Sequence, residues 1–118
     1  MTLPWVRLDS SFPVNTKVLS LVDDRHFRAG FAYVCGLAVS GAQGTDGYIS
    51  PTSLKHTHAT MKEAEQLVDV GLWLPSHAGW MIRDWAEYQP SSTEMQDRRK
   101  RAQAAAEIRW ARQRGETS

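Results

Sequence analysis

The sequence predicts a mainly α-helical fold with a small β-hairpin, namely a winged helix-turn-helix followed by a basic C-terminal helix or tail. Three observations predict it: helix signals on both sides of a short turn, an aromatic-rich hairpin pattern after them, and a run of basic residues near the end of the chain. The 118 residues suit one small hydrophobic core. We therefore expect a winged-helix domain at residues 1–92 and a basic tail, rich in Arg and Ala, at residues 93–118.

The composition excludes several classes of protein. Hydrophobic residues make up 42% and charged residues 23% of the chain, ordinary values for a globular protein that exclude wholesale disorder. The longest uncharged run, residues 29–45, is rich in Gly, Ser and Ala and too short to span a membrane. The N-terminus lacks the pattern of a secretory signal, and the single cysteine, Cys35, is typical of a reducing compartment. The sequence therefore predicts a cytoplasmic protein without a membrane partner.

The N-terminal segment is expected to be extended and then helical. Residues 5–9, Trp-Val-Arg-Leu-Asp, are either a short strand or an extended arm that packs Trp5 and Leu8. Asn15 is a good N-cap, because its side-chain oxygen accepts a free amide of the first helical turn. The short helix after it has three apolar residues on one face: Val18, Leu21 and Val22.

A second helix, about residues 25–42, has an apolar stripe along its length. Asp24 is placed to cap its first turn. The residues of the stripe recur at helical spacing, and they are Phe27, Phe31, Val34, Cys35 and Ala38. Glycine and alanine at other positions lower the helix propensity but allow neighbouring elements to approach closely. The periodicity predicts that the stripe faces the core, with Cys35 as a buried structural thiol.

A turn, a short strand and a third helix follow. Residues 44–47, Gly-Thr-Asp-Gly, are a turn signal, and residues 48–49 form a very short strand. Ser50 and Pro51 are then a typical N-cap and first residue of a helix that runs to about Thr57. This helix is the first member of the pair that a helix-turn-helix requires.

A fourth helix begins after a turn of about three residues. Thr60 and Glu63 match a capping box, in which the hydroxyl and the carboxylate each bind a free backbone amide. Gly71 is placed to end the helix. Four apolar residues share its inner face: Met61, Ala64, Leu67 and Val68.

A β-hairpin is expected after the helices. Residues 72–75 and 80–85 are rich in aromatic and aliphatic side chains, and they flank a glycine-containing turn at residues 76–79. Two helices around a tight turn, framed by a strand and a hairpin, are the parts of a winged helix-turn-helix. A three-helix bundle with an appended hairpin is the competing architecture.

The chain also resembles a known family over about residues 5–91. The segments that carry the resemblance are Trp5-Val6-Arg7-Leu8-Asp9, Lys17-Val18-Leu19, Thr45-Asp46-Gly47-Tyr48-Ile49-Ser50, Leu67-Val68-Asp69-Val70-Gly71-Leu72-Trp73, Gly79-Trp80-Met81-Ile82-Arg83-Asp84-Trp85 and Tyr88-Gln89-Pro90-Ser91. They resemble phage and prophage winged-helix proteins described as replisome-organizer or replication-initiator N-terminal domains. The resemblance implies a DNA-associated role in replication initiation or transcription regulation, in the cytoplasm of a bacterial host cell. Longer family members have an additional C-terminal domain that recruits a helicase or loader, for which we expect no room here.

The fourth helix is the expected recognition helix, because the second helix of such a pair normally enters the major groove of double-stranded DNA. Its outward positions carry one basic and three acidic side chains, an arrangement that phosphates repel. The candidate DNA contacts therefore gather at the turn, with one more at the hairpin tip. They are Lys55, Thr57, His58, Thr60, Lys62, Gln66 and His77. In an alternative, the fold is an adaptor that binds a host or phage protein and recognises no DNA sequence.

The net charge of +1 hides an asymmetry along the chain. Residues 1–92 have seven basic and nine acidic side chains, whereas residues 93–118 have seven basic and four acidic ones. A slightly acidic body with a basic tail is typical of a protein that binds nucleic acid or another acidic surface. Six tail residues are candidate phosphate contacts: Arg98, Arg99, Lys100, Arg101, Arg109 and Arg112.

The tail is expected to be helical, because it has no Pro or Gly between residues 93 and 114. On a helical wheel four of its arginines share one stripe, and an adjoining stripe holds Met95, Ala102, Ala106 and Trp110. The tail is either a helix docked through Trp110 and Met95, a dimer contact between two tails, or a segment that folds on a nucleic acid. In a further interpretation Trp110 simply packs against the body. Double-stranded DNA is the expected partner, and replication or transcription proteins and a second copy of the chain are left open.

The sequence predicts no enzyme. His56 and His58 are two residues apart, and with one cysteine they make no zinc constellation. The sequence contains no glycine-rich phosphate-loop motif, and no nucleophile and base can be paired from it. We therefore expect no catalytic residue, no metal and no cofactor.

Overall fold

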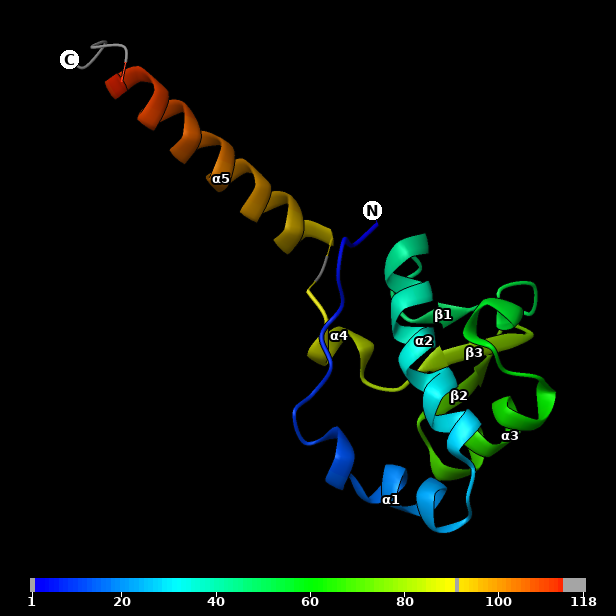
Figure 1. Cartoon of the computed structure of the whole chain (residues 1–118). Helices are drawn as coiled ribbons and strands as arrows, with labels where there is room; N and C mark the ends of the chain where they lie inside the picture. Colours follow the sequence, from blue (N-terminus) through cyan, green and yellow to red (C-terminus); the bar gives the residue numbers. More distant parts are fainter. Residues whose placement is uncertain (1, 91, 114–118) are drawn as a thin grey trace.

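Most of the residues that the structure describes are helical, and a small antiparallel sheet of three strands packs against some of the helices. The computed structural model describes residues 2–90 and 92–113. In chain order the elements are the 3-10 helix η1 (Phe12–Val14), α1 (Thr16–Asp23), α2 (Phe27–Gln43), β1 (Tyr48–Ile49), the 3-10 helix η2 (Leu54–Thr57), α3 (Met61–Val70), β2 (Trp73–Ser76), β3 (Gly79–Ile82), α4 (Trp85–Tyr88) and α5 (Ser92–Gln113). Figure 1 shows α2 lying along the sheet and α5 projecting away from the body.

The N-terminal residues form an extended arm and not a strand. The amide of Leu3 donates to the carbonyl of Gly41 at 2.8 Å, and Leu3 and Val6 pack against the end of α2. Trp5 and Leu8, which were expected to pack, are instead 46% and 50% exposed. That expectation is wrong, because the bond to Gly41 decides which side of the arm faces α2.

The sequence predicts the cap of α1 and most of its core face correctly. The Asn15 side chain accepts the amide of Lys17 at 2.9 Å and so caps the helix as predicted. Of the predicted apolar face, Val18 and Leu21 are buried and Val22 is exposed. Asp24 ends α1 and does not cap α2, which begins later than predicted and has no side-chain cap.

The buried face of α2 is not the one that the periodicity predicts. Phe27 is 62%, Phe31 58% and Val34 36% exposed, so the large residues of the predicted stripe lie outside. Ala38 is exposed as well, and Cys35 is only partly buried. The buried residues are small apart from one leucine, and they are Ala29, Ala32, Gly36, Leu37, Ser40 and Gly41.

Close approach by the sheet and the arm explains why the small residues of α2 are buried. The indole ring of Trp73 packs on Gly36, where a Cβ atom would lie 3.1 Å from the ring. Val6 packs on Gly41, where a Cβ atom would lie 2.5 Å from its methyl group. Only a face without bulky side chains allows such contacts, so the aromatic face of α2 is left outside.

The first member of the predicted helix pair is shorter than expected. The Ser50 hydroxyl accepts the amide of Ser53 at 3.2 Å in a turn, and the 3-10 helix η2 starts only at Leu54. The bounds of the predicted α3 are confirmed, with its capping box at the start and Gly71 at its end. Of its predicted inner face, Ala64 and Leu67 are buried and Met61 is 57% exposed. Gly71 has a φ of 84°, a left-handed conformation that glycine adopts without strain.

The predicted β-hairpin is present and has a tighter turn than expected. β2 and β3 pair along their whole length, so only His77 and Ala78 form the turn, with φ values of 44° and 65°. Two left-handed residues in a two-residue turn match the right-handed twist of a hairpin. β1 pairs with the other edge of β3, which makes the strand order β1-β3-β2. Trp85, predicted to extend the second strand, lies buried in α4 instead.

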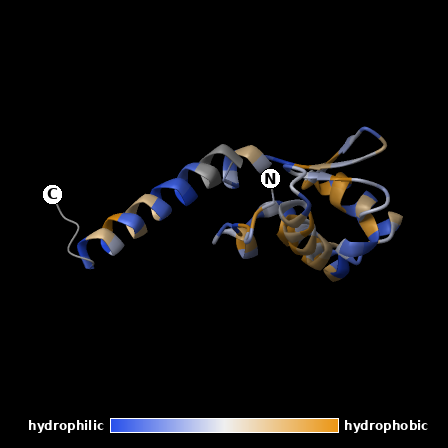
Figure 2. Ribbon diagram, turned by 90° about the horizontal axis from the view of Figure 1, so that it is seen from above, coloured by the Kyte–Doolittle hydropathy of each residue, from blue (hydrophilic) through white to orange (hydrophobic). Residues whose placement is uncertain are grey.

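The predicted basic tail is helical as α5 and projects from the body as a separate rod (Figure 1). Figure 2 shows that most of its residues are hydrophilic, in contrast to the body helices. Trp110 is 61% exposed, so the interpretation in which Trp110 packs against the body is wrong. The side chain of Met95 and residue 114 lie outside the described part of the chain.

Candidate nucleic-acid interface

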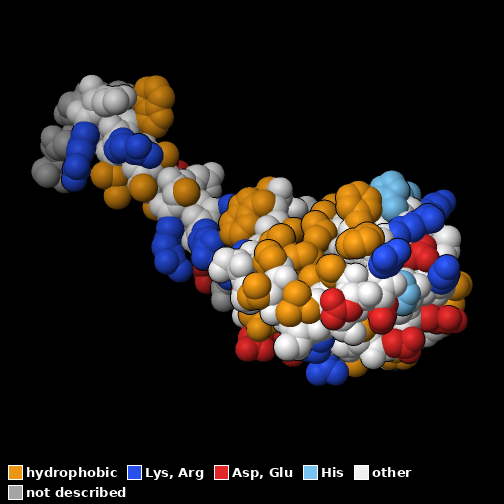
Figure 3. All heavy atoms as spheres, turned by 60° about the horizontal axis from the view of Figure 1, so that its bottom comes forward, with side chains coloured by type: hydrophobic (Ala, Val, Ile, Leu, Met, Phe, Trp, Pro, Cys, Tyr) orange, Lys and Arg blue, Asp and Glu red, His pale blue; other side chains and the backbone are white. Residues whose placement is uncertain are grey.

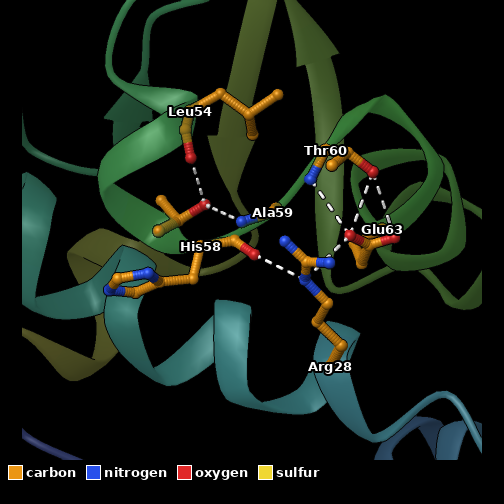
Figure 4. Close-up of polar contacts among 7 residues, drawn as sticks. Arg28, Leu54, His58, Ala59, Thr60 and Glu63 are labelled. Atoms are coloured by element: carbon orange, nitrogen blue, oxygen red, sulfur yellow. Dashed lines mark hydrogen bonds and ion pairs between the residues drawn. The ribbon is translucent and has the colours of Figure 1, made fainter.

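A buried carboxylate holds the start of α3 in place (Figure 4). Glu63 is 5% exposed, and its Oε1 accepts both the backbone amide and the hydroxyl of Thr60 at 3.0 Å. The Nε of Arg28 lies 3.2 Å from the same carboxylate oxygen. That Nε also donates to the carbonyl of His58 at 2.8 Å. Arg28 therefore ties α2 both to the turn and to the first residues of α3.

The surroundings of Glu63 keep its carboxylate charged. Burial alone would raise the pKa of Glu63, but the hydrogen bonds from Thr60 and the charges of Arg28 and Lys62 outweigh this effect. The pKa is held below its ordinary value of 4.5. The guanidinium of Arg28 offsets the negative charge of this carboxylate, so the pair together adds little net charge to the surface.

Replacing Glu63 by Gln is expected to lower the free energy of unfolding by about 1–2 kcal/mol at neutral pH, because charge-assisted hydrogen bonds are lost. The folded-state pKa is depressed, so this stabilisation is present above pH 4.5 and is lost as the pH falls through the folded-state value. Denaturant unfolding of the variant and the wild type from neutral pH to about pH 3 measures the difference, which should shrink on acidification. Glu65→Gln, an exposed carboxylate on the same helix, should change the free energy by less than about 0.5 kcal/mol. A difference that does not depend on pH would contradict this role of Glu63.

Exposed basic side chains surround this anchored turn. Lys55 in η2, Lys62 in the first turn of α3, His56 and His58 are all exposed. The side chain of Arg28 is 62% exposed although it is bonded to the turn. The positive end of the α3 dipole adds to the charges of Arg28, Lys55 and Lys62. We call these five residues, Arg28, Lys55, His56, His58 and Lys62, the turn cluster.

The charge of α3 changes along its length. Lys62 lies in its first turn, whereas the exposed carboxylates of Glu65 and Asp69 lie further along. The first turn of α3 therefore attracts phosphates and the last turns repel them. If only the start of α3 enters a groove of DNA, the phosphates lie near Lys62 and away from the carboxylates of Glu65 and Asp69.

The predicted contacts at the turn differ in how accessible they are. Thr57 is 0% exposed, and its hydroxyl donates to the carbonyl of Leu54 at 2.6 Å and accepts the amide of Ala59 at 3.3 Å. The prediction that Thr57 contacts DNA is therefore wrong, because this threonine builds the turn from inside. Thr60 is exposed with its hydroxyl used in the capping box, and Gln66 is half-buried on α3.

Sequence reasoning missed Arg28, which organises the turn cluster. Arg28 is 30 residues before His58 in the chain, so no local pattern joins the two. The buried carboxylate of the capping box needs a cationic partner, but neither its burial nor the identity of that partner can be recognised from the sequence. Arg28 is the only arginine of α2, whose N-terminus follows a short connection from α1.

His77 lies at the exposed tip of the hairpin. The hydroxyl of Tyr48 donates to the His77 carbonyl at 2.7 Å, which ties the edge strand β1 to this tip. The His77 side chain is thereby presented on a braced turn, at the place where the sequence predicts a wing contact.

The basic residues of α5 form a second surface. The six predicted phosphate contacts on α5 are all exposed: Arg98, Arg99, Lys100, Arg101, Arg109 and Arg112. Figure 1 shows α5 projecting on the side of the body that lies away from α3. The turn cluster and the α5 arginines therefore do not form one continuous patch.

A small cleft lies elsewhere, between the N-terminal arm, α1, α2 and α4. Its volume is about 110 Å³, and Arg7, Tyr33, Asp84, Tyr88 and Gln89 are among the residues that line it. Pockets that bind small molecules usually measure about 300 Å³ or more. The cleft is therefore too small for a typical cofactor.

Three further findings bear on the class of protein. Within residues 2–90 and 92–113, no three His, Cys, Asp or Glu side chains come close enough together to hold a metal ion. No helix in the same part of the chain combines the length and the apolar character needed to cross a membrane. Comparison of the chain with protein-family models, curated proteins and solved structures found no match. The two basic surfaces are the features from which a function can be argued.

Proposed function

We propose that the chain is a winged helix-turn-helix protein of phage type that binds double-stranded DNA and acts in replication initiation or transcription regulation. The observation that carries the proposal is the turn cluster, five exposed basic side chains gathered around the start of α3, where Arg28 forms an ion pair with the buried carboxylate of Glu63. Phosphate neutralisation by basic side chains is the main source of affinity for DNA.

The order of the elements supports this assignment. η2, a tight turn and α3 stand where a helix-turn-helix has its two helices, and the β2–β3 hairpin follows as the wing. In such proteins the N-terminal residues of the second helix contact base edges. In α3 these are the residues around Lys62, where the local charge is positive, with Gln66 one turn further on as the base contact.

α5 supplies the sequence-independent part of the affinity. The arginine row from Arg98 to Arg112 extends about 20 Å along the helix axis. Each DNA strand has one phosphate for about every 3.4 Å of the duplex axis, so a row of this length spans enough of the DNA backbone for several arginine–phosphate contacts. Because α5 projects beyond the body, the arginine row reaches phosphates of the DNA backbone that the turn cluster does not contact.

The proposal is tested by selection from a random duplex library. The wild type should enrich one preferred site, and replacing Lys55, Lys62 and Gln66 together by Ala should abolish the enrichment while non-specific binding persists. The matched control replaces two cations and a glutamine outside the turn cluster, Lys17, Arg83 and Gln103, and should enrich the same site. Failure of the wild type to enrich any site, with no effect of the triple variant in any DNA assay, would overturn the proposal.

A second candidate function is a protein-binding adaptor. The exposed carboxylates on the later turns of α3 and the exposed apolar face of α2 favour it, since neither is expected of a surface that only contacts phosphates. The adaptor recognises no DNA sequence, so the selection experiment separates the two functions directly.

A further inference from the structure

We propose that the N-terminal end of α2 is a stacking surface for unpaired bases, so that the protein also binds single-stranded DNA. The surface consists of the side chains of Phe27 and Phe31 together with the imidazole ring of His58. This inference rests on the proposed DNA-binding function and adds single-stranded DNA as a second class of ligand, bound beside the turn cluster.

Two aromatic rings stand out from the body at this end of the helix. Phe27 and Phe31 are 62% and 58% exposed, the highest values among the large hydrophobic residues of α2. They are one helical turn apart, so both rings project from the same side. Burying a phenylalanine stabilises a protein by about 1.5–3 kcal/mol, so the two exposed rings leave apolar surface that a ligand can cover with a gain in free energy.

The third ring belongs to the turn before α3. The centroids of the Phe31 and His58 rings are 5.7 Å apart, and the ring planes are inclined by 38°. His58 has a φ of 65°, and its carbonyl is held by Arg28 at 2.8 Å. The His58 ring is therefore placed beside Phe31 by a fixed turn, and the two rings offer adjacent π-faces from different elements.

Basic side chains lie next to the rings. Arg28 follows Phe27 on the same helix and donates to the carbonyl of His58, whose ring lies beside Phe31. Lys62 is the residue before Glu63, with which Arg28 forms an ion pair. Figure 3 shows a face of the body on which a band of hydrophobic side chains meets His, Lys and Arg side chains at one end. Single-stranded nucleic acids are bound by this combination, with aromatic rings for the bases and cations for the phosphates.

The distribution of exposure along α2 favours bases over a partner helix. Among the large hydrophobic residues of α2, the exposed fraction is greatest at the two phenylalanines and falls to 36% at Val34. The next exposed residue of the stripe, Ala38, has only a methyl group to offer. A docked helix needs large apolar anchors over several turns, whereas a base needs one ring and a nearby cation.

The test compares three labelled probes by fluorescence anisotropy: a single-stranded oligonucleotide, the same phosphate backbone with abasic sites, and a duplex. Wild-type protein should bind the normal single strand more tightly than the abasic one. Replacing Phe27 and Phe31 by Ala should weaken binding of the normal strand at least about tenfold and leave the abasic strand and the duplex within about twofold. Phe31→Trp should retain the preference for bases. Tyr88→Ala, which truncates an exposed ring on α4, is the matched control and should change nothing.

The outcomes separate this inference from the function on which it rests. Equal binding of normal and abasic strands by the wild type, or unchanged binding by the double variant, overturns the stacking surface while duplex binding stands. Sedimentation velocity tests whether the same rings form a contact between two copies of the chain. If loss of a dimer is the only effect of the double variant, the stacking surface is also overturned, because the rings then serve a protein contact. If the wild type binds no DNA probe at all, the proposed function fails together with this inference.

Discussion

Replacing Arg98, Arg101, Arg109 and Arg112 by Gln is expected to lower the affinity for duplex DNA by about 10²- to 10³-fold at physiological salt. Each of these side chains is exposed on one stripe of α5, where it can neutralise a phosphate and release a counterion. Four lost contacts reduce the affinity by roughly this factor at about 0.15 M salt, because each contributes about 0.9 to the salt exponent. Binding of a labelled duplex, followed by anisotropy, measures the change.

The control for this prediction removes the same charge elsewhere. Arg7, Lys17, Arg25 and Arg83 are basic residues of the body outside the turn cluster, and their replacement by Gln makes the same change in net charge. This variant should lose much less affinity than the α5 variant. Equal losses in the two variants would mean that overall charge, and not the α5 row, determines binding.

Replacing Gly79 by Ala is expected to lower the free energy of unfolding by about 3 kcal/mol, the largest effect on stability that we expect from a single methyl group. A Cβ atom at this position collides with the backbone oxygen of Ile49 and would lie 2.9 Å from the hydroxyl oxygen of Tyr48. Relief requires β1 to move away from β3, which breaks their pairing and the hydrogen bond from Tyr48 to the hairpin tip. Thermal unfolding should show a melting temperature lower by about 10–20 °C.

Gly30→Ala is the matched control for Gly79→Ala. A Cβ atom at Gly30 has no neighbour within 4 Å, and the residue lies inside α2. The same substitution there should stabilise the protein by about 0.5–1 kcal/mol, because alanine loses less backbone entropy in a helix. The changes in the free energy of unfolding are expected to have opposite signs in the two variants. A Gly79→Ala protein as stable as the wild type would contradict the described packing of β1 on β3.

Local signals in the sequence predict the start of α1, both ends of α3 and the hairpin, whereas the expected N-caps Asp24 and Ser50 start no helix. The Asn15 cap, the capping box of α3 and its stop at Gly71 depend on residues within four positions of each other, and all three are confirmed. The β2–β3 hairpin is also predicted by neighbouring residues. These features follow from the chemistry of short segments, which tertiary packing does not change here.

The buried face of α2 could not be predicted from its periodicity. The apolar stripe repeats at the helical period, yet the opposite face is buried, because Trp73 and Val6 approach Gly36 and Gly41 too closely for larger side chains. These contacts join residues more than 30 positions apart in the chain, so a pattern within the helix holds no information about them. Burial of the small-residue face leaves Phe27 and Phe31 exposed, and these two rings are the basis of the proposed stacking surface.

The candidate interface could be predicted in part. Lys55, His58 and Lys62 lie together at the turn as exposed residues, in the places that the helix-turn-helix pattern predicts. Thr57 could not be recognised as buried, because only the folded turn shows that its hydroxyl bonds inward. Arg28 could not be recognised as part of the cluster, because its partners come from a different part of the sequence.

The salt dependence of duplex binding tests the central claim most directly, namely that affinity resides largely in the basic residues of α5. For the whole chain we predict a slope of log affinity against log salt of roughly −5 to −6, for six or seven phosphates neutralised. Residues 1–92 alone should remain folded, lose most of the non-specific affinity and show a much shallower slope. Equal affinity and an equal slope for the whole chain and for residues 1–92 would contradict the account.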